Sequence, residues 1–231
     1  MKKIIISPPF SNILPNSKYY TRIIGTYTLK RRRGLWRVLT TLKKVKDGWL
    51  NKVGLRNPGI NRAPNKACII SISQLEYGDF DKMLNILSKK KSVLGIEFNI
   101  SCPNASVLEV TQANILKAKD LFKYVVIKLP HNFNNTLLEN YIDLGIEYVH
   151  ISNTKLVAKG ALSGRDLIKN NVEKIKYLKY KHPKIKIIGG GGIYSIEDYI
   201  EYNIAGADYF SLSTILLNPI KAYKLIRKIH D

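Results

Sequence analysis

Short apolar runs alternate with longer amphipathic stretches along almost the whole chain. Eight of these runs are four to seven residues long and rich in Ile, Val, Tyr or Phe. Continuous apolar runs of this length are typical of strands that are buried on both faces of a parallel sheet. The predicted strands are Lys3–Ser7, Arg22–Tyr27, Ala67–Ser73, Leu94–Ile100, Tyr124–Leu129, Tyr148–Ser152, Lys186–Gly189 and Tyr209–Leu212.

Most segments between these runs have apolar residues three or four positions apart, which is the spacing of one helix face. Phe80, Met83, Leu84 and Leu87 are one such set, and Ser195 before Glu197-Asp198 predicts a helix start. Eight strands alternating with helices predict an α/β protein, a single (β/α)8 TIM barrel, rather than a doubly wound sheet. We expect one domain over residues 1–231, with 35–64 as a long functional loop.

The charge balance is strongly basic but has an ordinary explanation. Lys and Arg number 38 against 17 Asp and Glu, which gives a net charge of +21. Such a balance indicates nucleic acid as a partner in some proteins. Here the lysines are dispersed, and Lys, Ile, Asn and Tyr, all with AT-rich codons, are abundant together. We therefore do not expect a nucleic-acid partner, although anionic small ligands would be attracted.

The two cysteines and the absence of long apolar segments exclude several classes of protein. Cys68 and Cys102 cannot form a disulfide framework, and no Cys/His cluster has zinc spacing, so no metal is predicted. No segment approaches the roughly 18 apolar residues that span a bilayer, and the apolar run at Ile4 is too short for a signal peptide. We expect a cytoplasmic protein without membrane contact.

Polar side chains follow the predicted strands, at the barrel face where catalysis takes place in this fold. Four asparagines are expected at this rim, and their carboxamides suit a neutral heterocycle with C=O and N–H groups: Asn51, Asn99, Asn104 and Asn153. Cys102 lies among them and is a candidate nucleophile or general base, whereas Cys68 lies within an apolar strand and is interpreted as a core residue. His131 and His150 are weaker candidates because neither has a carboxylate neighbour in sequence.

Glycines and a lysine near the ends of later strands indicate an anion site. Gly189–Gly192 precedes the helix start at Ser195, and Ser213-Thr214 follows the last strand. Glycine lets backbone N–H groups approach an anion closely, so this pattern predicts a phosphate site in the seventh and eighth loops. Lys128 closes the fifth strand, where it can meet an anionic ring or a phosphate.

These residues together resemble the dihydroorotate dehydrogenase family. Asn99-Ile-Ser-Cys102-Pro-Asn104 is the specific element, and Asn51-x-x-Gly54-Leu55-x-Asn57-x-Gly59 is similar to the family's substrate loop. The resemblance covers nearly the whole chain in order. It implies FMN-dependent oxidation of dihydroorotate to orotate in pyrimidine biosynthesis, with Cys102 removing the C5 proton while a hydride leaves for the flavin. A cysteine at this position is the mark of the class 1 enzymes.

The resemblance also implies the remaining roles. The substrate-binding residues would be Asn51, Gly54, Leu55, Asn99, Asn104, Asn153 and Thr154. The FMN-binding residues would be Thr26, Asn99, Lys128, Gly164, Gly191, Gly192, Ser213 and Thr214. Family members are commonly homodimers, and class 1 members use fumarate, or NAD through an electron-transfer partner subunit.

One departure from the family keeps two other interpretations open. The family carries a lysine before Thr26, and this chain has Gly25, so Lys30 or Arg56 would have to supply the cation. One alternative is an FMN oxidoreductase of the same fold that acts on another dihydropyrimidine, including one in RNA. The other is a non-catalytic barrel that binds phosphate or flavin.

Overall fold

The protein is a closed barrel of parallel strands. The computed structural model describes residues 1–34, 40–46, 48–52, 54–101, 108–152 and 154–230. Eight strands close in the order β1-β12-β11-β8-β7-β6-β5-β2, and every neighbouring pair is parallel. Their bounds are β1 Ile4–Ile6, β2 Tyr20–Tyr27, β5 Ile69–Ile72, β6 Gly95–Asn99, β7 Tyr124–Lys128, β8 Tyr148–Ile151, β11 Lys186–Gly190 and β12 Tyr209–Leu212. Each overlaps a predicted strand, so the (β/α)8 prediction is confirmed.

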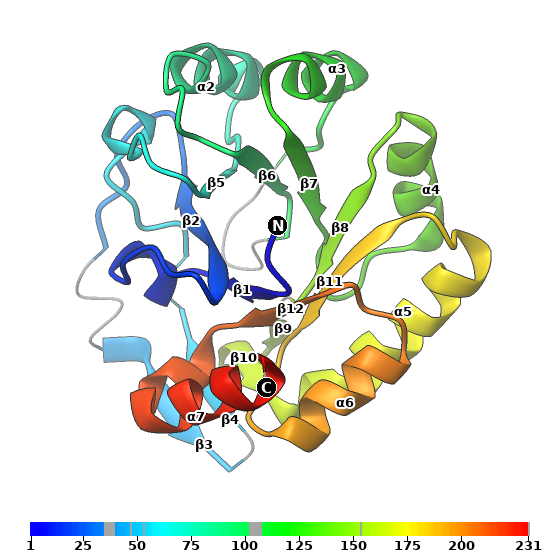
Figure 1. The fold of residues 1–231 in the computed structure, drawn as a ribbon. Helices are drawn as coiled ribbons and strands as arrows, with labels where there is room; N and C mark the ends of the chain where they lie inside the picture. Colours follow the sequence, from blue (N-terminus) through cyan, green and yellow to red (C-terminus); the bar gives the residue numbers. More distant parts are fainter. Residues whose placement is uncertain (35–39, 47, 53, 102–107, 153, 231) are drawn as a thin grey trace.

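Helices lie around the outside of the barrel (Figure 1). They are α2 Asp79–Leu87, α3 Gln112–Leu121, α4 Asn135–Asp143, α5 Ile168–Lys181, α6 Ile196–Ile204 and α7 Pro219–His230, with short 3-10 turns at Phe10–Asn12, Ile60–Arg62, Arg165–Leu167 and Thr214–Leu217. Phe80, Met83, Leu84 and Leu87 are fully buried, as their spacing predicts. Among the described residues, none of the helices has both the length and the apolar character that crossing a membrane requires.

A second, antiparallel sheet lies beside the barrel, and the sequence did not indicate it. Its order is β3-β4-β10-β9, with β3 Lys43–Val45, β4 Gly48–Asn51, β9 Lys155–Val157 and β10 Gly160–Gly164. The prediction of one long loop over 35–64 is therefore wrong for 43–45 and 48–51. These strands are short and partly exposed, so they lack the apolar runs that reveal the barrel strands. The sheet carries Asn51 and Gly164 toward the same end of the barrel.

The barrel interior changes from apolar to polar along its axis. Five side chains fill the apolar layer, namely Ile5, Ile23, Ile69, Val126 and Ile188. Side chains alternate between the two faces of a strand, so the residue two positions further on also points inward. Those positions are polar or small: Ser7, Gly25, Ser71, Lys128 and Gly190. The polar layer lies toward the carboxyl ends of the strands, where a barrel enzyme places its site.

Candidate functional site

Two cavities lie at the carboxyl ends of the strands and share part of their lining. The larger has a volume of about 360 Å³, and the smaller about 200 Å³. Asn51, Lys128, Thr154 and Thr214 line both cavities, which therefore adjoin one another. Lys128 ends strand β7, and Asn51 ends strand β4 of the second sheet.

The structure brings the described candidate residues together at these cavities. The larger cavity is lined by Thr26, Asn51, Gly54, Leu55, Asn99, Lys128, Thr154 and Thr214. The smaller one adds Gly191, Gly192 and Ser213. Gly164 lies directly behind Gly192, where a Cβ on Gly192 would come within 2.5 Å of the Gly164 carbonyl oxygen. Cys102, Asn104 and Asn153 lie outside the described residues.

The glycine turn is shaped for close approach of a ligand. Gly191 and Gly192 have φ angles of 91° and 85°, in the left-handed region that favours glycine. Any side chain at Gly192 would collide with backbone, as the Gly164 contact shows. The turn therefore presents bare backbone to the smaller cavity, which Ser213 and Thr214 also line.

The start of helix α6 is already occupied by its own side chains. Ser195 caps this helix with Asp198 in a capping box, which confirms the predicted start. The Asp198 carboxylate accepts hydrogen bonds from the backbone N–H groups of Tyr194 and Ser195, at 2.8 and 2.9 Å. An anion in the smaller cavity would consequently depend on the glycine turn and on Ser213-Thr214, and not on this helix start.

Asn99 is held in a fixed orientation at the base of the larger cavity. Its amide group donates a 2.7 Å hydrogen bond to Thr26 Oγ1, and its carbonyl oxygen accepts from Ser101 N at 3.1 Å. An amide nitrogen has two N–H groups, so the other one is left for a ligand in the cavity that Asn99 lines. The same contacts fix Ser101, which directly precedes Cys102 in the chain.

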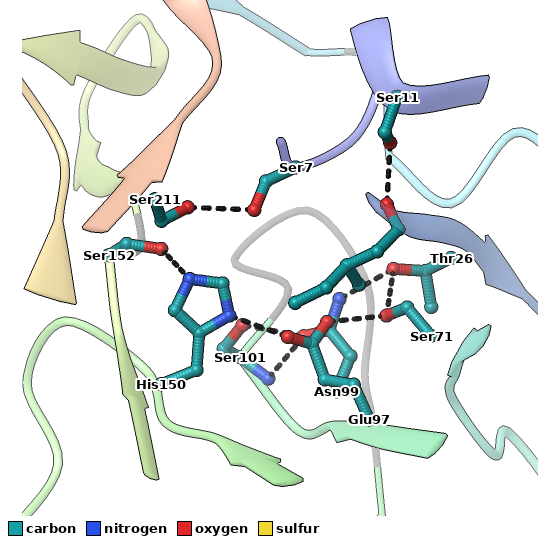
Figure 2. A network of polar contacts seen from close by, with 11 residues as sticks. Ser7, Ser11, Thr26, Ser71, Glu97, Asn99, Ser101, His150, Ser152 and Ser211 are labelled. Carbon is teal, nitrogen blue, oxygen red and sulfur yellow. Dashed lines mark hydrogen bonds and ion pairs between the residues drawn. The ribbon is translucent and has the colours of Figure 1, made fainter. Parts of the chain in front are cut away.

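Beneath the cavities lies a buried chain of hydrogen bonds (Figure 2). Ser71 on β5 donates to Glu97 on β6 at 2.7 Å, and Glu97 Oε2 lies 2.5 Å from His150 Nδ1 on β8. The hydroxyl of Ser152 bonds to the other ring nitrogen, His150 Nε2. At the opposite end, Thr26 lies 3.0 Å from the Ser71 hydroxyl. The chain thus runs from Thr26 in the larger cavity to Ser152 in the smaller one.

The electrostatics of this chain define its protonation. Burial alone would raise the pKa of the Glu97 carboxyl, but the electrostatic interaction and the hydrogen bond with His150 outweigh burial and lower it. Burial lowers the pKa of His150, the charge of Lys128 acts in the same direction, and Glu97 opposes both. The pair is therefore an ionised carboxylate and a neutral imidazole. Nδ1–H donates to Glu97, and Nε2 accepts from the Ser152 hydroxyl.

Sequence reasoning missed Glu97. His150 has no carboxylate neighbour in sequence, but strand β6 supplies one in three dimensions. The available clue was an acidic residue inside a strand predicted to be buried on both faces, since such a group must be paired. His150 itself is fully buried, lines neither cavity and contacts the Ser152 hydroxyl through Nε2.

The other two minor candidates are assigned by their surroundings. His131 lines neither cavity. Cys68 is fully buried, and burial raises the pKa of its thiol to about 11. Its interpretation as a core residue is confirmed.

Gly25 occupies the cavity wall without a side chain. Its φ of 137° favours glycine, and a Cβ there would come within 2.5 Å of the Ser71 carbonyl oxygen. A lysine at this position would force the backbone to move. Among the described lining residues, Arg56 and Lys128 are the cations of the larger cavity, and Lys30 is not part of it.

Comparison with known proteins identifies the family. The family model for dihydroorotate dehydrogenase matches residues 109–231. The catalytic subunit of dihydroorotate dehydrogenase B (NAD(+)) from Thermoanaerobacter pseudethanolicus is 30% identical, over 80% of this chain and 75% of that protein. The chain belongs to the dihydroorotate dehydrogenase family. Members of this family are flavin-dependent, and the chain is an oxidoreductase that acts on a CH–CH bond.

Other relatives extend the match along the chain. The corresponding catalytic subunit from Endomicrobium trichonymphae is 26% identical over 96% of this chain and 82% of that protein. The dihydroorotate dehydrogenase A (fumarate) of Lactiplantibacillus plantarum is also 26% identical, over 73% of this chain and 67% of that protein. A crystal structure of the Eimeria tenella dihydroorotate dehydrogenase with ferulenol has a TM-score of 0.74 over 90% of this chain and 73% of that chain. At 16% identity, that likeness supports the fold alone.

Proposed function

We propose that this member of the dihydroorotate dehydrogenase family oxidises dihydroorotate to orotate in pyrimidine biosynthesis, with FMN as its cofactor. The observation that carries the proposal is the joining of the two cavities at Lys128. The larger cavity gathers amide and hydroxyl groups suited to a dihydropyrimidine ring, and the smaller one adjoins it with a bare glycine turn. The substrate and the phosphate end of a cofactor would thus have separate, connected places.

The smaller cavity fits the phosphate of FMN. Backbone at Gly191 and Gly192 would meet the phosphate oxygens, and the hydroxyl of Thr214, which also bonds Tyr194 at 2.7 Å, would donate to them. Gly164 leaves the room that this turn needs. When bound, FMN supplies the acceptor for the hydride that leaves dihydroorotate. Lys128 would face the ring end of the cofactor and stabilise negative charge there.

The substrate would be held by side chains of the larger cavity. Asn51, Asn99 and Thr154 would pair with the ring amide groups, and the backbone at Gly54 and Leu55 would close the cavity over them. Asn104 and Asn153 complete this set on the family resemblance. Cys102 would take the C5 proton as the general base.

The test of this function is the response of the bound flavin to dihydroorotate without oxygen. The purified protein should be yellow, and dihydroorotate should bleach the flavin band near roughly 450 nm. Fumarate added next should restore the colour if the chain works like the A-type relative. If fumarate fails, the electron-transfer partner subunit of the B type is required. A yellow protein that dihydroorotate does not bleach contradicts the substrate, and a colourless protein after incubation with FMN contradicts the cofactor.

Arg56 is expected to replace the missing lysine as the partner of the substrate carboxylate. Arg56→Gln should raise the KM for dihydroorotate by about tenfold or more with little change in kcat, because a charge-assisted hydrogen bond to a carboxylate is worth about 1.5–3 kcal/mol. Steady-state kinetics give both parameters. Lys30→Gln is the matched control, since Lys30 lies outside the cavity and should leave KM within about twofold. A larger effect at Lys30 than at Arg56 would reverse the assignment.

A further inference from the structure

A third hollow, separate from the two site cavities in most of its lining, is surrounded by arginines. It has a volume of about 1150 Å³, and its cations are Arg31, Arg32, Arg33, Arg56 and Arg62. No acidic residue is among the described residues that line it. We call this feature the arginine groove. Five like charges around one concave surface repel one another, so their gathering calls for an anionic ligand.

The arginine groove is not explained by the composition that accounts for the net charge. The excess of basic residues is mainly lysine, and arginine occurs nine times in the chain. Five of those nine line this one groove. The described arginines elsewhere have partners in the protein: Arg22 bonds to Asn16, Arg165 pairs with Asp198 and Arg227 donates to Tyr19. The basic residue that clusters in the arginine groove is therefore the scarce arginine and not the abundant lysine.

The five guanidinium groups are available for a ligand. None of them takes part in an ion pair or a side-chain hydrogen bond within the described part of the chain. All five residues are exposed. A guanidinium group carries five N–H donors in a fixed fork that matches two phosphate oxygens.

Hydrogen bonds hold the backbone segments that carry these side chains together. Arg32 and Asn57 exchange backbone hydrogen bonds, from Arg32 N to Asn57 O at 2.9 Å and from Asn57 N to Arg32 O at 3.2 Å. The buried Asn57 side chain also bonds to Thr28 and Gly59. The segments that carry the arginines are thereby joined into one platform.

We infer that the arginine groove binds the phosphate backbone of a single-stranded nucleic acid. Its volume exceeds the roughly 300–1,000 Å³ of ordinary small-molecule sites, and five forks exceed what one phosphate can use. Tyr27 and Pro58 are the ring-bearing residues of its described lining, and the buried Tyr27 offers no open slot for a base. Contacts would thus go to phosphates along a flexible strand, without reading its sequence.

The strand would pass the mouth of the larger site cavity, because Asn12, Gly25 and Arg56 line both hollows. The inference rests on the geometry and charge of the groove, and it holds whether or not dihydroorotate is the substrate.

Fluorescence anisotropy with a labelled oligouridylate of about 12 nucleotides tests this inference. Single strands release about 0.7 counterions per phosphate contact, so five contacts, with no dihydroorotate present to occupy Arg56, predict a slope of log K on log salt near −3.5. Arg31→Gln/Arg32→Gln/Arg33→Gln should weaken binding by about tenfold or more and reduce the slope by about 2. The matched control is Lys89→Gln/Lys90→Gln/Lys91→Gln, which removes the same charge from three consecutive lysines outside the arginine groove and should leave binding within about twofold. Circular dichroism on both variants verifies that they are folded.

Four outcomes would overturn the inference. The first is no binding of the oligonucleotide at about 50 mM salt. The second is equal weakening by the arginine and lysine variants, which would mean diffuse attraction by the net charge. The third is equally tight binding of polyglutamate, which would indicate an acidic protein partner. The fourth is equally tight binding of uridine monophosphate, which would indicate a small phosphorylated ligand.

Discussion

Glu97→Ala is expected to lower the free energy of unfolding by about 3–5 kcal/mol, the usual cost of breaking a buried pair from one side. The side chain is almost fully buried and accepts hydrogen bonds from His150 and Ser71. Alanine would leave both donors without an acceptor and open a cavity in the polar layer of the barrel. Urea unfolding at neutral pH, followed by circular dichroism, measures the change.

Asp81→Ala is the matched control for this prediction. Asp81 pairs with Lys117, but both side chains are partly exposed, and such pairs contribute at most about 1 kcal/mol. If Glu97→Ala cost no more than Asp81→Ala, the buried pair would not be a stabilising part of the barrel interior. The network would then have to be a weak contact that the surrounding strands tolerate.

The Glu97–His150 pair also connects stability with the site. It holds Ser152, which lines the smaller cavity, and reaches Thr26 in the larger one through Ser71. A buried polar network fixes its members in one geometry when every group is satisfied. Here that geometry fixes two hydroxyl groups at opposite ends of the site. One belongs to Thr26 on strand β2, and the other belongs to Ser152, directly after strand β8.

The barrel could be predicted from the sequence because its strands are buried on both faces. Runs such as Ile69–Ile72 and Tyr124–Lys128 are almost continuously apolar, and the helices between them have a clear period. The sheet formed by β3, β4, β9 and β10 could not be predicted. Its strands are three to five residues long and form two local hairpins, β3 with β4 and β9 with β10. The two hairpins join only through β4 and β10, which pair across more than a hundred positions, as Asn51 does with Ala161.

The candidate site likewise has a part that the sequence could predict and a part that it could not. The rule that ligands bind at the carboxyl ends of the strands was sufficient to select Asn99 and Lys128, which line the cavities. Asn51 also reaches them, although it comes from the second sheet. The pairing of Glu97 with His150 joins residues 53 positions apart, on strands separated by β7 in the barrel order, so no local pattern contains it.

The departure from the family pattern at Gly25 has a physical counterpart in the structure. The resemblance to the family indicates a missing cation at this position. The structure adds that the backbone here has no room for a side chain beside Ser71, and that Arg56 lines the same cavity. Position 25 thus provides no cation to the larger cavity, and Arg56 provides one to the same cavity.

Cys102→Ala is expected to slow the reduction of bound flavin by dihydroorotate by roughly 10²–10⁴-fold, the range that a general base contributes. Flavin binding should persist, because the proposed phosphate cradle at Gly191 and Gly192 does not involve this residue. Stopped-flow absorbance without oxygen measures the rate. Cys68→Ala is the matched control, since the Cys68 thiol is buried away from both cavities and should leave the rate within about twofold. Equal reduction rates in the Cys102 variant and the unchanged protein would remove Cys102 from the mechanism and leave the proton at C5 to another base.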